Sequence, residues 1–354
     1  MPLRINHAIL HVFDFVSCEN TFSAEEMDLT SKNAKNYASR MAKKGLDNLD
    51  NKHGRFAENS AFADELEAYF QGQANFVDLS VQIGQFLVDE LKHMEKTPSF
   101  DLLVVDFEED AEGAVNQMTE EEVDAAFKGH ANRYFGLFLL ESKQAYMHEM
   151  DYGDLGPKNG IIRNYATLPS PSQKLSSYAV VDLRSQDVLF VDKPRVISGE
   201  ERLLIPEGLL QCSMEASSKE TFEAVTQIVE AVAEEFGVNP AVAQAKTKAY
   251  VAETTEVEPD IDLEELADDI FESNEEIKAR FEEHVRSQEL PERIPLERKT
   301  VEKVAKNHKI RTDTGIEITF PAEYSKNPEY LSFTSEADGT ISIQLKNIGH
   351  LENR

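Results

Sequence analysis

Short apolar runs alternate with segments of helical spacing through the first part of the chain. Apolar runs of strand length predict three strands, at residues 5–15, 101–107 and 134–141. A further pair of runs, at residues 177–183 and 188–191, flanks a hairpin-turn segment at Arg184–Asp187. Apolar residues recur every three or four positions in three other segments, which predicts helices over residues 31–44, 61–71 and 74–96. The pattern predicts an α+β domain over residues 1–195, in which helices pack on an antiparallel sheet.

The rest of the chain, residues 196–354, is expected to be mainly helical and to end in a small β-meander. Helical spacing and capping residues predict helices over residues 219–236, 240–252, 263–271, 275–288 and 296–306. From residue 316 onward the pattern changes to period two and includes a turn-forming Asp338-Gly339 pair. Within the first domain, residues 151–173 are rich in Gly, Pro and Ser, which predicts a surface loop.

Composition limits the class of protein. The 354 residues include 66 Asp and Glu against 36 Lys and Arg, so the net charge is −30, and 41% are hydrophobic. Cys18 and Cys212 are too few for a disulfide framework, and no apolar run approaches the roughly 20 residues that cross a bilayer. We therefore expect a soluble intracellular protein that does not enter a membrane. Its net charge disfavours long-range attraction of the whole molecule to nucleic acid.

Positive charge is nevertheless concentrated in two segments. The first basic patch, within residues 32–55, contains Lys32, Lys35, Arg40, Lys43, Lys44, Lys52 and Arg55. The second basic patch, within residues 297–311, contains Arg298, Lys299, Lys303, Lys306, Lys309 and Arg311. One interpretation is that both are ordinary solvated helix faces. The other is that both bind phosphate groups of double-stranded DNA, which would make the binding strongly dependent on salt.

Negative charge is concentrated in residues 252–283. This segment has fourteen acidic residues against two basic ones, Lys278 and Arg280. Acidic helices of this kind are candidates for docking a basic protein partner. The residues that we expect to bind such a partner are Asp268, Asp269, Glu272, Glu275 and Glu276. An acidic adaptor is therefore an alternative function.

A search for catalytic and metal-binding patterns finds little. The chain has no phosphate-binding Gly-rich motif, no Gly-x-Ser-x-Gly motif and no Cys-x-x-Cys motif. His7 and His11 are four residues apart in a predicted strand, about 13 Å, which is too far for one metal ion. A cluster of carboxylates at Asp101, Asp106, Glu108, Glu109 and Asp110 leaves a metal-dependent nuclease as a third hypothesis. We expect no catalytic residue, no metal and no cofactor.

Three short features resemble the bacterial nucleoid-associated protein family of the NdpA/YejK type. They are the opening INHAILH (Ile5–His11), the long helical stretch Lys219–Lys306, and YLSFTSEADGTISIQLKNI (Tyr330–Ile348). The resemblance implies a cytoplasmic, nucleoid-located, non-enzymatic protein that binds DNA or DNA-associated proteins. The family supplies no catalytic residue to carry over. The amphipathic helix at residues 74–96 leaves a homodimer open, because its apolar stripe suits either a core or a partner.

Overall fold

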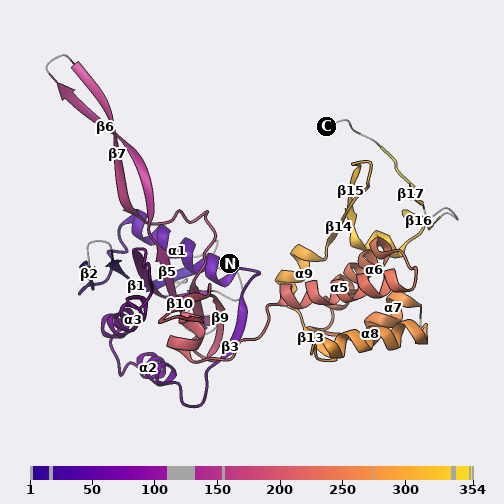
Figure 1. The fold of residues 1–354 in the computed structure, drawn as a ribbon, viewed down its shortest axis with the longest axis horizontal. Helices are drawn as coiled ribbons and strands as arrows, with labels where there is room; N and C mark the ends of the chain where they lie inside the picture. Colours follow the sequence, from indigo (N-terminus) through magenta and orange to yellow (C-terminus); the bar gives the residue numbers. More distant parts are fainter. Residues whose placement is uncertain are drawn as a thin grey trace, which may run out of the picture. The chain divides into compact units, whose positions relative to one another are not determined.

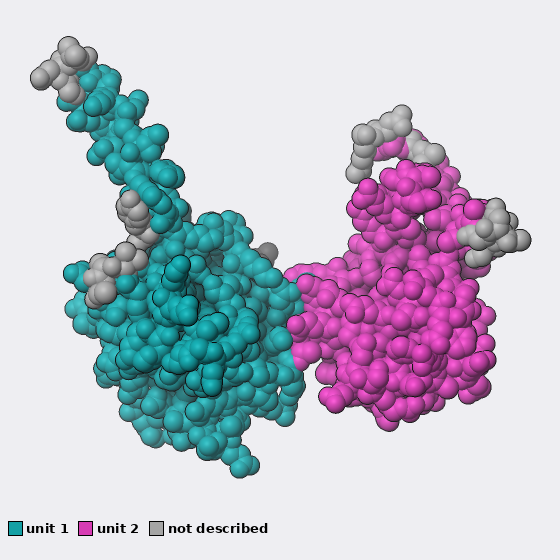
Figure 2. All heavy atoms as spheres, viewed as in Figure 1, with its two compact units in different colours: residues 1–215 teal, residues 216–354 magenta. Residues whose placement is uncertain are grey.

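The computed structural model describes the chain except residues 1–2, 16–18, 110–131, 154–155, 273, 336–339, 351 and 353–354. The chain divides into two compact units, residues 1–215 and residues 216–354, which are coloured separately in Figure 2. No helix among the described residues is long and apolar enough to cross a membrane.

The first unit is built on a seven-stranded sheet in which all neighbouring strands are antiparallel. Its strand order is β2-β1-β4-β5-β8-β9-β3. The bounds are Leu3–Asp14 for β1, Glu19–Thr21 for β2, Lys52–Arg55 for β3, Phe100–Glu109 for β4, Asn132–Glu141 for β5, Tyr178–Asp182 for β8 and Asp187–Val191 for β9. The middle strands β4 and β5 are buried on both faces, which explains their unbroken apolar runs. The predicted antiparallel sheet is confirmed.

Helices cover both faces of this sheet (Figure 1). Helix α1 (Lys32–Leu46) covers one face, where Ala38 and Met41 are buried with the sheet residue Phe138. Helices α2 (Ala61–Phe70) and α3 (Phe76–Leu91) cover the other face, where Leu66 and Leu87 join a separate apolar cluster. The predicted helices of this domain are therefore confirmed, with ends that differ by a few residues.

The predicted loop at residues 151–173 is wrong over most of its length. Strands β6 (Lys143–Gly153) and β7 (Gly156–Thr167) form a two-stranded antiparallel hairpin that extends away from the body of the first unit (Figure 1). Most of its described side chains are exposed, on both faces, so no buried alternation marks the strands in the sequence. Among the described residues of this range, the segment that follows β7 has the irregular backbone that the composition predicted.

Residues 196–215, which we grouped with the second region, pack on the first unit. They contain most of β10 (Arg195–Ile197) and all of β11 (Glu200–Arg202) and η2 (Leu204–Leu210). Ile197, Leu204 and Ile205 are buried in the same cluster as α2 and α3. The first unit therefore extends past residue 195, to residue 215.

The second unit begins with a bundle of short helices and has an apolar core of its own. The helices are α5 (Ser218–Glu235), α6 (Pro240–Thr254), α7 (Leu263–Phe271), α8 (Glu275–Ser287) and α9 (Arg298–Val304), and β12 (Asp260–Asp262) pairs with β13 (Arg293–Pro295). Helix α5 starts with a capping box, in which Ser217 and Glu220 satisfy each other's backbone N–H groups. The predicted helical region is confirmed.

The strands at the end of the chain form two hairpins instead of one meander. β14 (Asn307–Arg311) pairs with β15 (Glu317–Pro321), and β16 (Leu331–Ser335) pairs with β17 (Ile341–Leu345). A short 3-10 helix, η3 (Ala322–Lys326), lies between the two hairpins in the sequence. The predicted turn at Asp338-Gly339 lies outside the described residues.

Candidate nucleic-acid interface

Helix α1 separates its apolar and basic residues onto opposite faces. Ala38, Met41 and Ala42 are buried against the sheet. A Cβ on Gly45 would lie 2.9 Å from the Phe138 ring, so glycine permits the close approach of the helix to β5. The opposite face carries four exposed cations, Lys32, Lys35, Arg40 and Lys43.

These four cations are available to an external anion. Helix α1 contains no acidic residue, and no ion pair joins any of the four to another residue that the structure describes. From Lys32 to Lys43 the helix rises by about 16 Å. A duplex carries roughly nine phosphate charges over that length, at one charge per about 1.7 Å of its axis. The stripe of cations is therefore long enough to contact several phosphates.

Lys44 has a different role from its neighbour Lys43. Its side chain is half-buried, and its Nζ donates hydrogen bonds to the backbone carbonyls of Pro171 (3.1 Å) and Gln173. Burial lowers the pKa of Lys44. The hydroxyl of Tyr37 donates to the carbonyl of Pro169 at 2.9 Å, so two residues of α1 hold the segment that follows β7. Lys44 therefore holds this loop through hydrogen bonds, whereas Lys32, Lys35, Arg40 and Lys43 are exposed.

The last two residues of the first basic patch lie on the edge strand β3, away from α1 in the sequence. Arg55 is exposed, and its Nε is 3.6 Å from Asp187 on the neighbouring strand β9. Lys52 is half-buried on the same strand. The structure thus divides the first patch into a helical part and a strand part.

The second basic patch is exposed throughout. Its residues come from α9 and β14 and from Lys306 between them. Arg298 lies 3.2 Å from Glu302 on α9, and Lys309 lies 2.7 Å from Glu317 across the hairpin. Pairs as exposed as these contribute about 0–1 kcal/mol, so they hold their cations only weakly. Lys303, Lys306 and Arg311 have no ion-pair partner among the described residues.

Three of the five acidic residues that we assigned to a basic partner already pair within the second unit. Asp268 lies 2.7 Å from Lys278, and Asp269 lies 3.0 Å from Lys326. Glu272 lies 3.3 Å from Lys246. The remaining two, Glu275 and Glu276, are exposed in the first turn of α8, where carboxylates interact favourably with the helix dipole. Lysines of the second unit therefore already pair with three of the five proposed partner-binding carboxylates.

Comparison with known families decides the group to which this protein belongs. The family model described as nucleoid-associated protein YejK matches residues 9–351, nearly the whole chain. The chain belongs to this family of nucleoid-associated proteins. The resemblance to this family that the sequence suggested is confirmed. No curated protein matches the chain.

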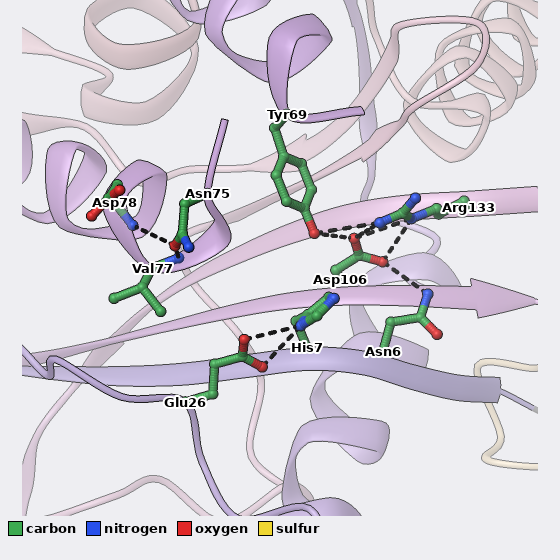
Figure 3. Close-up of polar contacts among 9 residues, drawn as sticks. All are labelled: Asn6, His7, Glu26, Tyr69, Asn75, Val77, Asp78, Asp106 and Arg133. Atoms are coloured by element: carbon green, nitrogen blue, oxygen red, sulfur yellow. Dashed lines mark hydrogen bonds and ion pairs between the residues drawn. The ribbon is translucent and has the colours of Figure 1, made fainter. Parts of the chain in front are cut away.

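In this family member the carboxylates suspected of nuclease chemistry serve the fold. Asp106 on β4 is fully buried, and Figure 3 shows the groups that surround it. Its carboxylate accepts hydrogen bonds from Asn6 Nδ2 (3.1 Å), the Tyr69 hydroxyl (2.5 Å), and Arg133 Nε (3.0 Å) and Nη2 (2.5 Å). The hydrogen bond from Arg133 to Asp106 raises the pKa of the guanidinium, and burial together with the Asp106 charge raises the pKa of Tyr69. These donors occupy both carboxylate oxygens.

The other candidates for metal or thiol chemistry are also accounted for. Asp101 is buried and accepts a hydrogen bond from Ser142 Oγ at 3.0 Å, and burial raises its pKa. Glu108 and Glu109 end β4, and Asp110 lies outside the described residues. Among the residues that the structure describes, no group of three or more His, Cys, Asp or Glu side chains is placed to hold a metal ion.

His7, His11 and Cys212 lie in separate environments. His7 Nδ1 is 2.9 Å from Glu26, whereas His11 is fully buried between Ser80 Oγ and the backbone N–H of Ser23, each at 3.0 Å. Burial lowers the pKa of His11 to about 4 and raises the pKa of Cys212 to about 11. A thiol with this pKa is a poor nucleophile near neutral pH.

Sequence reasoning missed the partners of Asp106. Arg133 stands at the start of a buried apolar run, but no sequence spacing relates it to Tyr69 or Asn6. The network forms because β1, β4, β5 and α2 meet at one end of the sheet.

Proposed function

We propose that this protein is a non-enzymatic component of the bacterial nucleoid that binds double-stranded DNA in the cytoplasm, without a cofactor. The observation that carries the proposal is the face of α1 with Lys32, Lys35, Arg40 and Lys43, which is basic and exposed in a chain of net charge −30. Membership of the nucleoid-associated family supports the same function.

The contacts are made to phosphate oxygens. Lysine and arginine ammonium and guanidinium groups donate to phosphates without reading the base sequence, and each contact displaces a condensed counterion. The acidic remainder of the molecule repels DNA, so binding is confined to the basic faces and weakens steeply as salt increases. The exposed cations Lys303, Lys306 and Arg311 provide a second contact of the same kind.

A titration of labelled duplex DNA by fluorescence anisotropy at several salt concentrations tests this proposal. The four cations of α1, at one phosphate each, contribute about −3.6 to the slope of log affinity against log salt, which is a loss of roughly 150-fold between 50 and 200 mM salt. Contacts from Lys303, Lys306 and Arg311 add to this slope. Replacing Lys35 and Lys43 by Gln makes the slope less steep by about 1.8.

The matched control removes two lysines outside α1. Lys92 and Lys96 are exposed in the segment that follows α3, so Lys92→Gln with Lys96→Gln changes the net charge equally. This control is expected to leave the slope within about 0.3 of the wild type. Equal slopes for the two double variants would remove α1 from the interface. If the double variant Lys303→Gln with Lys306→Gln makes the slope less steep and the α1 double variant does not, the second unit holds the contact.

The acidic adaptor is the weaker alternative, because Asp268, Asp269 and Glu272 are already paired with lysines of their own unit. A basic partner would have to displace those pairs or depend on Glu275 and Glu276.

A further inference from the structure

The β6–β7 hairpin, here called the arm (residues 143–167), is an unusual element of the first unit. It pairs with no other strand among the described residues and extends from the body of its unit (Figures 1 and 2). A two-stranded sheet without a covering layer is only marginally stable in water. The arm therefore has two uncovered faces against which another surface can pack.

One face of the arm is aromatic and contains no carboxylate. Residues that are directly opposite in an antiparallel pair point to the same side of the sheet. The register places Tyr146 opposite Arg163, His148 opposite Ile161, Met150 opposite Asn159, and Tyr152 opposite Pro157, and these eight residues form what is here called the aromatic face.

The large apolar side chains of this face are strongly exposed. Tyr146 is 72% exposed, Met150 65%, Tyr152 79% and Ile161 79%. The guanidinium of Arg163 lies 5.9 Å from the centre of the Tyr146 ring. The opposite face carries both Glu149 and Asp151. Contiguous apolar surface of this kind, rich in tyrosine and arginine, is typical of a protein interface.

Charge favours a second copy of this chain as the occupant. Two molecules of net charge −30 repel each other, but the arm has three basic residues (Lys143, Lys158, Arg163) and three acidic ones (Glu149, Asp151, Asp154). Its strands of eleven and twelve residues are about 35 Å long. Contact through this neutral element keeps the acidic bodies farther apart than the Debye length of about 8 Å at physiological salt.

The same charges disfavour DNA on the arm. The aromatic face has a single permanent cation, Arg163, and the arm as a whole is neutral. A DNA-binding ribbon needs a surplus of cations to displace counterions. The arm lacks that surplus, whereas α1 has it.

We propose that the aromatic faces of two arms pack together about a two-fold axis and hold this protein as a homodimer. With the arms antiparallel, Tyr152 near the tip of one arm lies against Tyr146 and Arg163 near the base of the other, and the reverse contact follows from symmetry. Four apolar side chains from each copy bury on the order of 1,000 Å², which reaches the lower range of specific interfaces.

Sedimentation of the full chain tests the proposal. Wild-type protein is expected to reach the mass of a dimer by about 100 µM at physiological salt. Ile161→Glu places a carboxylate in the apolar contact and is expected to weaken the dimer at least about 100-fold. Its neighbour Ile162 lies on the opposite face and is 42% exposed, so Ile162→Glu is the matched control and leaves the dimer intact.

A cysteine variant tests the contact even if a charge on the arm disturbs its folding. Met150 lies near the middle of the aromatic face, where the two-fold axis brings equivalent residues together. In a background with Cys18→Ser and Cys212→Ser, we expect Met150→Cys to form a disulfide-linked dimer on mild oxidation. Met147→Cys, on the opposite face, is expected to stay monomeric under the same conditions.

Three results would overturn the proposal. One is a wild-type monomer at all concentrations up to about 100 µM. Another is equal behaviour of the two glutamate variants together with equal cross-linking of the two cysteine variants. The third is a loss of DNA affinity in Ile161→Glu with no change in the mass of the free protein, which would assign the arm to nucleic acid. The Lys35→Gln and Lys43→Gln variant is expected to remain a dimer, which would show that dimerisation does not depend on the residues proposed to bind DNA.

Discussion

Loss of Arg133 is expected to destabilise the first unit more than loss of its partner Asp106. Arg133→Met leaves the Asp106 carboxylate, whose side chain has no solvent exposure, without its counter-charge. Breaking a buried pair in this way costs about 3–5 kcal/mol. Asp106→Asn instead leaves the Arg133 guanidinium without its counter-charge, but the Arg133 side chain is 31% exposed and can turn toward water. That change removes charged hydrogen bonds and costs about 1–3 kcal/mol.

The two variants are compared by urea unfolding at pH 7. Hydrogen exchange in peptides of β4 and β5 reports on the first unit, and peptides of α5 and α6 give an internal reference in the second unit. Arg184→Met removes an exposed arginine and is expected to change the unfolding free energy by less than about 0.5 kcal/mol. The reasoning is refuted if Asp106→Asn is as destabilising as Arg133→Met, because exposure of the remaining partner would then not decide the cost.

Two further predictions concern the first unit. The pKa of His11 is about 4 in the folded chain against 6.5 for the free side chain, so the unfolded chain binds more protons between these values and stability falls as pH decreases from about 6.5 to 4. Unfolding at pH 5 should require about 2 kcal/mol less than at pH 7, and an unchanged pH slope in His11→Gln would assign the effect to other groups. Gly54→Ala places a Cβ 2.5 Å from the backbone carbonyl of Ser213 and should lower the unfolding free energy by about 1–3 kcal/mol. Gly160→Ala, whose Cβ would have its nearest neighbour at 3.6 Å, is the control, and an equal loss in both variants would contradict the steric argument.

The sequence predicts the buried elements of this fold well, because burial leaves a periodic pattern. Strands β4 and β5 and helices α3 and α5 each show the run or the spacing that their surroundings require. The arm has no such pattern, because no other described part of the chain covers either of its faces. Its Gly, Pro and Asn residues then predict a loop.

The candidate site shows the same limit at the level of single residues. Lys43 and Lys44 are adjacent, identical residues in the sequence. Lys43 is exposed, whereas Lys44 donates hydrogen bonds to the carbonyls of Pro171 and Gln173. Which of them faces the sheet depends on the phase of α1 and on a loop about 130 residues away. Asp106 likewise stands in the sequence as one member of a carboxylate cluster, and only the packing of β1, β4, β5 and α2 shows that it is buried.

The position of β3 has a consequence for synthesis of the chain on the ribosome. This strand is made early, but its sheet partner β9 begins at Asp187, and the bridges on its other side join His53 to Glu215 and Phe56 to Cys212. Roughly 130 residues must be translated before β3 can pair, which takes on the order of ten seconds at about 5–20 residues per second. The second unit, in contrast, packs helices that are close in sequence, such as α5 with α6 and α7 with α8. The nascent first unit therefore has an open sheet edge until residue 215 has been added, and that interval is when chaperones have an unpaired strand to protect.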